Sequence, residues 1–154
     1  MVMGSYEVEA HAVAPREVVF AVLDDAPGWA AWAGFTVASA RWEREGDPPP
    51  GGPGAIRRVG RWPLFGREQI LERTEPTHMA YTVLSGVPVR GYHADIDLHD
   101  DSRAGTGATR IVWRASFEPR VPGTAGLMSW WLRRLIGGYA RRAAAEAERR
   151  VANE

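Results

Sequence analysis

The stretch that decides the fold is PGTAGLMSWWLRRLIGGYARRAAAEAERRV, residues Pro122–Val151. Its apolar side chains recur with the period of an α-helix, so that at about 100° per residue one stripe forms along its length. That stripe collects Met128, Leu132, Leu135, Tyr139, Ala143 and Ala147. A long amphipathic helix must bury its stripe against another layer of secondary structure. The preceding sequence consists mostly of strand-like alternation, so we expect that layer to be a sheet.

Seven segments before the helix have the composition and alternation of β-strands. Two short helices are predicted directly after the first strand, at Pro15–Leu23 and Trp29–Trp32, and turn-forming residues separate the remaining segments. The predicted strands are Ser5–Val13, Phe35–Glu45, Ala55–Trp62, Arg67–Thr74, His78–Ser85, Val89–His99 and Ala108–Glu118. The sequence therefore predicts an α+β fold in which a curved, seven-stranded antiparallel sheet surrounds the C-terminal helix, as one domain across residues 1–154.

Composition excludes several classes of function. The 154 residues carry nineteen basic and nineteen acidic side chains, so the protein has no net positive charge that would attract nucleic acid. There is no cysteine, which rules out disulfides and thiolate metal sites. The first residues lack a basic start followed by an apolar run, and no apolar run approaches the roughly 20 residues of a membrane span. We expect a cytoplasmic protein that needs no cofactor.

Several segments carry a resemblance to a known family. They are APREVVFAVLDDAPGWAAW, GAIRRVG, REQILERTEP, AYTVLSGVPVRGYHADIDL and GATRIVWRASFEP, which together cover most of the chain. They resemble the START-related helix-grip superfamily (SRPBCC-type), and within it the polyketide cyclase/dehydrase branch. The resemblance implies a helix-grip fold with one internal cavity. It leaves the chemistry open, because that branch includes aromatic polyketide cyclases as well as lipid and hormone carriers.

Strand pairing can be predicted by placing apolar residues on a shared inner face. For the fifth and sixth strands this pairs Met79 with Ile96, Tyr81 with Ala94 and Val83 with Tyr92. For the sixth and seventh strands it pairs Ile96 with Ile111, Ala94 with Trp113 and Tyr92 with Ala115. Large side chains then face small ones across each row, as a filled inner face requires.

The opposite face of the sixth strand carries His93, Asp95, Asp97 and His99 at every second residue. Histidine and aspartate side chains are common metal ligands in proteins. Neighbours two apart on one strand project in parallel instead of converging, however, so we predict a solvated face and no metal site. The predicted register places Arg110 across from Asp97 as a surface ion pair, and Arg114 across from His93.

The fourth strand is ambiguous because Ile70 and Leu71 compete for its inner face. The resemblance places Glu68 and Ile70 inward, and the short connection before this strand then sets Arg57 opposite Glu68. Two interpretations stay open: a buried pair that anchors an apolar cavity, or a solvated pair at the sheet edge. A buried pair must be complete, since burying either charge alone costs several kcal/mol.

Candidate site residues follow from this arrangement. The inward aromatics Tyr81, Tyr92 and Trp113 are core residues in the first place, and they line a cavity if one exists. The predicted ligand-binding set is Trp32, Ile70, Tyr81, Tyr92, Ala94, Trp113, Leu135 and Tyr139. For catalysis the candidates are Glu68 as base, Arg57 as the partner of an oxyanion, and Tyr81 or Tyr92 as acid.

Three functions remain possible at this point. The chain binds a hydrophobic, ring-containing small molecule as a carrier, or it is a cyclase or dehydratase acting on a polyketide-like substrate. The third is an interaction module that contacts a protein or membrane partner through the exposed Trp130 and the arginine pairs of the last helix, and a homodimer is also possible. Of the two partners in this third function, we do not expect the membrane. Motifs such as HExxH, the P-loop and GxGxxG are absent from the sequence.

Overall fold

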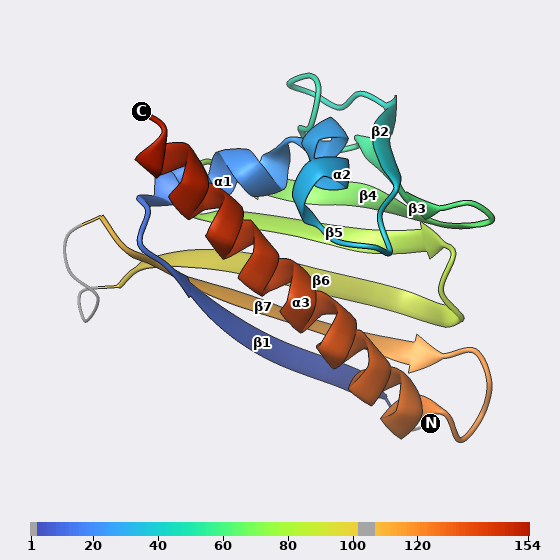
Figure 1. Cartoon of the computed structure of the whole chain (residues 1–154). Helices are drawn as coiled ribbons and strands as arrows, with labels where there is room; N and C mark the ends of the chain where they lie inside the picture. The colour runs from blue at the N-terminus through green and yellow to red at the C-terminus, as the bar shows by residue number, and fades with distance from the viewer. Residues whose placement is uncertain (1–2, 102–106) are drawn as a thin grey trace.

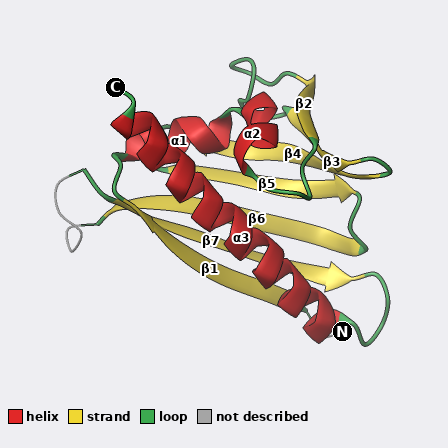
Figure 2. Cartoon of the chain, in the orientation of Figure 1, coloured by secondary structure: helices red, strands yellow, loops and turns green. Residues whose placement is uncertain are grey.

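In the computed structural model, which describes residues 3–101 and 107–154, a single antiparallel sheet is crossed by one long helix (Figure 1). The strand order is β1-β7-β6-β5-β4-β3-β2, so all neighbours except β1 and β7 are consecutive in the chain. The strands are β1 (Gly4–Ala12), β2 (Ser39–Arg44), β3 (Ile56–Arg61), β4 (Leu64–Thr74), β5 (His78–Ser85), β6 (Val89–Asp100) and β7 (Thr109–Pro119). Figure 2 shows that the helices lie on one face of this sheet. The predicted helix-grip α+β fold is confirmed.

The short helices follow β1 as predicted, and the long helix closes the chain. They are α1 (Arg16–Asp24), the 3-10 turn η1 (Ala26–Gly28), α2 (Trp29–Trp32) and α3 (Ala125–Ala152). The two ends of α3 are tied to the two ends of β1: Ser5 N donates to Ser129 Oγ at 3.0 Å, and Val13 N donates to Glu148 Oε2 at 2.8 Å. The helix therefore lies along the β1 side of the sheet.

The buried stripe of α3 changes in character along the helix. Its first half buries Met128, Leu132 and Ile136, whereas its second half buries alanines, including Ala143 and Ala147 with no exposed surface. The predicted stripe is confirmed except for Leu135, which is half-buried. Small side chains let the second half of α3 approach α1 and the sheet closely, while the larger ones in the first half span a wider gap.

Two strand boundaries were wrongly predicted. The predicted strand Phe35–Glu45 begins only at Ser39, because the backbone turns at Gly34, where φ is +100° and Val37 N donates to the Gly34 carbonyl oxygen at 3.1 Å. The predicted connection 63–66 is shorter than expected. Leu64 pairs with Arg61, so that β3 and β4 form a tight hairpin with only residues 62 and 63 between them.

The strand registers confirm one prediction and correct another. Met79 pairs with Ile96 and Tyr81 with Ala94, as predicted, whereas the predicted Val83–Tyr92 pair is not formed in the ladder. Between β6 and β7 the prediction is wrong by two residues: Trp113 pairs with Ile96, not with Ala94. In the corresponding rows Ile111 pairs with Leu98, Ala115 with Ala94, Arg114 with Asp95 and Arg110 with His99.

A bulge between Arg90 and His93 sets two residues of β6 against one of β7. Beyond it the register differs by two residues from the predicted one, which leaves every side chain there on its predicted face. The predicted Asp97–Arg110 ion pair is consequently wrong. Arg110 Nη1 instead lies 3.0 Å from Glu9 Oε1, on the neighbouring strand β1.

Three further features bear on the predictions. Most of the predicted loop 100–107 lies outside the described residues. Trp130 is 54% exposed, as predicted from its position opposite the stripe, and the Arg134 guanidinium lies over its ring at 5.4 Å. No helix in residues 3–101 and 107–154 has the length and apolar character needed to cross a membrane.

Candidate functional site

A cavity of about 350 Å³ lies between the first half of α3 and the inner face of the sheet. Its size falls within the range of small-molecule sites. The sheet contributes residues from β3 to β7, and the helix contributes Leu132, Leu135, Ile136 and Tyr139. The cavity exists where the larger side chains of α3 hold the helix away from the strands.

Aromatic rings make up the inner wall. Trp113 has no exposed surface, and its indole N–H donates to the Tyr81 hydroxyl at 3.0 Å. The ring of Trp29 from α2 meets Trp113 edge to face at 6.2 Å between centroids, and meets Tyr139 of α3 in the same way at 5.8 Å. These edge-to-face contacts fix the rings that would touch a ligand. The wall is therefore rigid and apolar.

One ion pair stands in this apolar wall. Arg57 Nε donates to Glu68 Oε1 at 2.6 Å across the β3–β4 ladder, as the predicted register requires. The Arg57 side chain is 1% exposed and that of Glu68 is 20% exposed. Of the two interpretations left open by the sequence, the structure shows the buried pair on the inner face. Glu68 lines the cavity.

The Arg57 guanidinium is held between two rings. Its central carbon lies 4.7 Å from the Trp29 ring centroid and 4.8 Å from that of Tyr81. Cation–π contact of this kind strengthens when the cation is desolvated. In the described part of the chain, Nη2 of Arg57 is buried without a hydrogen-bond partner. Glu68 is thus the main group that compensates the buried positive charge.

Three tyrosines form a polar cluster at the cavity wall, which Tyr81 and Tyr92 line and Tyr6 does not. The hydroxyls of Tyr6 and Tyr92 are hydrogen-bonded to each other, and the rings of Tyr92 and Tyr81 lie 5.9 Å apart. Burial raises the pKa of all three phenols well above its usual value, and ionisation of one would raise the pKa of its neighbour further. The three side chains are therefore neutral, and each can donate its hydroxyl proton in a hydrogen bond.

Tyr6 was not predicted as part of the site. Alternation of apolar and charged residues along Ser5–Val13 is typical of an inner position for Tyr6. Its neighbours, however, depend on the β1–β7 and β6–β7 registers. Tyr6 pairs with Ala115, which pairs with Ala94, which pairs with Tyr81. Two alanines thus lie between two tyrosines in one row, leaving room above them for Tyr92.

The mouth of the cavity includes residues outside the predicted ligand-binding set. It is formed by Phe35, by the β3–β4 hairpin tip with Trp62 and Leu64, and by Trp131 of α3. The first three are 77–82% exposed, and Arg61 covers the Phe35 ring at 4.2 Å. A signal was available in the sequence, because a hairpin tip reading WPLF is apolar where turns are usually polar.

The predicted ligand-binding residues divide into two groups. The cavity is lined by Tyr81, Tyr92, Trp113, Leu135 and Tyr139. The structure places Trp32, Ile70 and Ala94 outside the cavity lining, as buried parts of the surrounding core. Ile70 is nevertheless on the inner face as predicted, with 3% of its surface exposed, whereas Leu71 faces outward.

On the helix side, Tyr139 reaches the edge of the cavity. Its hydroxyl is hydrogen-bonded to Thr36 Oγ1 at 2.8 Å, and this contact ties α3 to the turn that precedes β2. Burial raises the pKa of Tyr139, against the lowering effect of that hydrogen bond. The same tyrosine therefore positions the mouth and contributes to the wall.

The geometry agrees with a comparison to protein families. Residues 3–148 match the family described as "Polyketide cyclase / dehydrase and lipid transport". The chain belongs to this family. The match extends from β1 into the last turns of α3, so it covers every element that forms the cavity.

Solved structures show the same fold in proteins of several kinds. The chain is similar to the Zhui aromatase/cyclase from a Streptomyces species, at 20% identity with a TM-score of 0.73, covering 97% of this chain and 96% of that one. It is similar to a Thermobifida fusca protein at 23% identity with a TM-score of 0.73, covering 94% and 91% of the two chains. Ara h 8.0201 aligns at 14% identity with a TM-score of 0.70, covering 95% and 98%. None of the curated proteins matches by sequence.

Proposed function

We propose that this member of the polyketide cyclase/dehydrase and lipid transport family binds a hydrophobic, ring-containing small molecule in the cavity under α3. The observation that carries the proposal is the combination of an aromatic-walled cavity of about 350 Å³ with a single carboxylate on its wall. Small-molecule sites are generally built in this way, from an apolar lining and a few placed polar groups.

The wall also suggests which polar group the ligand carries. The only hydrogen bond of the Glu68 carboxylate in the described part of the chain is the one from Arg57 to Oε1. The carboxylate can therefore accept a further hydrogen bond from the ligand, which favours a hydroxyl or phenol on an aromatic ring system. A ligand without a donor would fill the same space but leave this acceptor unused.

Catalysis is a second candidate, supported by the same carboxylate. Cyclisation or dehydration of a polyketide-like chain requires a base to remove a proton beside a carbonyl group, and an acid or a positive charge near the carbonyl oxygen. Glu68 is the proposed base, Arg57 the proposed partner of the oxygen, and Tyr81 or Tyr92 the proposed neutral donor. Holding the flexible chain in a folded shape between the rings would contribute through proximity.

Binding is tested with a pair of matched ligands. Titration of the protein with anthraquinone and with a hydroxylated anthraquinone, followed by tryptophan fluorescence, should show saturable binding of both and tighter binding of the hydroxylated compound. Glu68→Gln should remove most of that difference, since the amide keeps the volume but loses the charge. Native mass spectrometry of protein purified from its own host should also show a retained molecule that solvent extraction removes.

Two neighbouring substitutions provide the control. Val83 lines the cavity, whereas Leu84 points to the opposite face of β5 and is 37% exposed. Val83→Trp should fill the cavity and prevent binding, and Leu84→Trp should leave binding unchanged. Equal effects of the two substitutions, or no saturable binding by the wild-type protein, would refute the proposal.

The carrier and the enzyme are then separated by turnover. A poly-β-ketone thioester mimic incubated with the wild-type protein should cyclise faster than in buffer if Glu68 acts as a base. Glu68→Gln should abolish that acceleration while the anthraquinones still bind. Tight binding without any acceleration would support the carrier alone.

A further inference from the structure

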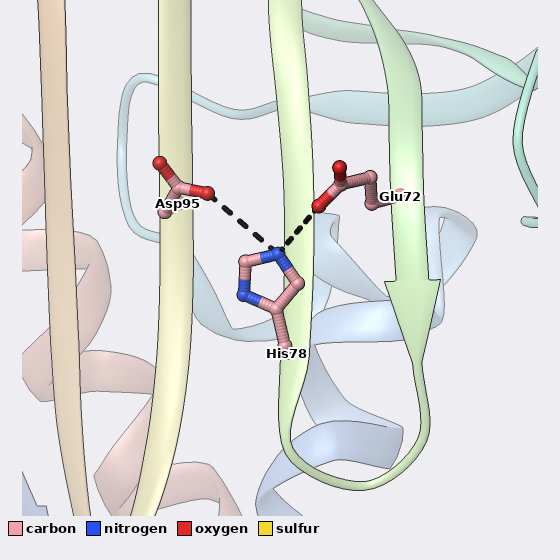
Figure 3. A group of neighbouring side chains, drawn as sticks. All are labelled: Glu72, His78 and Asp95. Carbon is pink, nitrogen blue, oxygen red and sulfur yellow. Dashed lines mark hydrogen bonds and ion pairs between the residues drawn. The ribbon is translucent and has the colours of Figure 1, made fainter.

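A second group of functional side chains lies on the outer face of the sheet, away from the cavity. His78 of β5 stands between two carboxylates on the adjacent strands, Glu72 of β4 and Asp95 of β6 (Figure 3). His78 Nε2 is 3.1 Å from Glu72 Oε2 and 3.6 Å from Asp95 Oδ1. The three ligand atoms all lie within 4.8 Å of one another. The group therefore converges on a single point.

The ring of His78 is held in the orientation that this requires. Its other nitrogen, Nδ1, lies 2.8 Å from Asp97 Oδ1. A carboxylate that accepts the Nδ1–H of histidine leaves Nε2 with a lone pair, and this arrangement is the usual support for a metal-bound histidine. Asp97 thus aims Nε2 at the point shared by Glu72 and Asp95.

The two separations from His78 Nε2 are close to those around a small divalent cation. With metal–ligand bonds of about 2.0–2.2 Å, tetrahedral zinc holds neighbouring ligand atoms about 3.3–3.5 Å apart. The two separations from His78 Nε2, 3.1 and 3.6 Å, lie on either side of that range. One imidazole with two carboxylates is also a donor set that first-row divalent metals accept.

The charge around the group is negative. Glu72, Asp95 and Asp97 surround one imidazole, and the Arg114 guanidinium approaches only Asp97, with 3.7 Å between Nη2 and Oδ2. His93 reaches the second oxygen of Asp95, with 3.3 Å between Nε2 and Oδ2. Two carboxylate oxygens directed at His78 Nε2 require either a proton on that nitrogen or a cation between them.

We propose that Glu72, His78 and Asp95 bind one Zn²⁺ ion, with Asp97 as the group that positions His78. Such an ion would link β4, β5 and β6 on their outer face. The expectation of no metal considered only neighbours along β6, which point in parallel. The convergence instead occurs across three strands, and it involves Glu72 and His78, which that argument did not include.

Binding is measured on tag-free protein that has been treated with EDTA and then freed of the chelator. Competition between the protein and a chromophoric zinc chelator at pH 7.5 should give one Zn²⁺ per chain. Replacing Zn²⁺ with Co²⁺ should give the intense visible absorption of a four-coordinate site. Zn²⁺ should also raise the melting temperature, because it binds the folded chain preferentially.

The variants identify the ligands. Glu72→Gln and Asp95→Asn should each weaken zinc binding at least tenfold, and Asp97→Asn should weaken it 10–100-fold although its side chain does not touch the ion. His99→Gln is the matched control, since His99 lies on the same face of β6, is exposed and is outside the group. It should leave the affinity unchanged.

Two results would overturn the proposal. One is the absence of stoichiometric zinc binding by the wild-type protein at micromolar concentrations, which would mean that a proton on His78 alone compensates the carboxylates. The other is binding that survives both Glu72→Gln and Asp95→Asn but is lost in His99→Gln, which would indicate adventitious binding by surface histidines. Circular dichroism of each variant should show an unchanged fold.

Discussion

Replacing Glu68 with alanine removes the partner of a buried cation. Arg57 is 1% exposed, it lies between Trp29 and Tyr81, and its Nε hydrogen bond to Glu68 is the one that compensates its charge. Alanine leaves the guanidinium in an apolar wall, and the small void beside it cannot fully hydrate the charge. We therefore expect Glu68→Ala to destabilise the protein much more than removal of an exposed carboxylate would.

The size of the effect follows from the burial of both partners. Breaking a buried ion pair by removing one side chain typically costs about 3–5 kcal/mol. Glu68 is 20% exposed and opens onto the cavity, so water can partly reach the remaining charge, and we expect the lower end, about 3 kcal/mol. For a chain of this length, that corresponds to a fall of roughly 6–12 °C in the melting temperature.

Urea denaturation followed by tryptophan fluorescence, together with thermal melting, measures this loss. The control is Glu43→Ala. Arg67 Nε donates to Glu43 Oε2 at 2.7 Å, almost the same geometry, but this pair lies on the surface and should contribute little. The double variant Arg57→Met/Glu68→Leu removes both charges and should recover most of the stability. If Glu68→Ala and Glu43→Ala shift the midpoint equally, the argument from burial is wrong.

Three further predictions test other parts of the molecule. Leu132→Asp places an unpaired charge under α3 and should abolish cooperative melting by circular dichroism, whereas Leu127→Asp, at a position 64% exposed, should not. Tyr6→Phe removes a buried hydroxyl hydrogen bond and should lower the free energy of unfolding, measured in urea, by about 1 kcal/mol. An unchanged free energy would mean that water already hydrates this hydroxyl. Burial lowers the pKa of His78, but its hydrogen bonds to Asp97 and Glu72 outweigh this and raise the pKa above 6.5. In EDTA, the difference in free energy of unfolding between wild type and His78→Gln should therefore be fully present below pH 6.5. It should decline as the pH rises through the folded-state pKa of His78. A difference that stays constant with pH would contradict this.

The order of the elements was predictable because it depends on local pattern. Helical periodicity after Pro122 and strand alternation before it fix the layers. The Arg57–Glu68 pairing was predicted with the help of the resemblance, which placed Glu68 inward, and the short hairpin then set Arg57 opposite it. Whether the pair is buried stayed open. These features depend on residues that are close in sequence or joined by short connections.

The predictions that failed concern contacts between residues that are distant in the sequence. A slip of two residues between β6 and β7 leaves every side chain on its face, so the hydrophobic pattern cannot detect it. That slip moved Trp113 from Ala94 to Ile96 and placed Ala115 beside Ala94. The register between β1 and β7 then places Tyr6 beside Ala115, in the row of Tyr81. Likewise, the inner face includes Ile70, Ala94 and Tyr81, but only the position of α3 determines which of them borders empty space.

The change in side-chain size along α3 has a consequence for ligand selectivity. Ala140, Ala143 and Ala147, all without exposed surface, set how closely the second half of the helix lies on its neighbours. The cavity lies under the first half, so a larger side chain at one of these alanines would change the tilt of the helix and hence the space beneath Leu132 and Ile136. The largest molecule that the protein accepts is thus set partly by residues that no ligand touches, and relatives with the same cavity wall can differ in the size of their ligands.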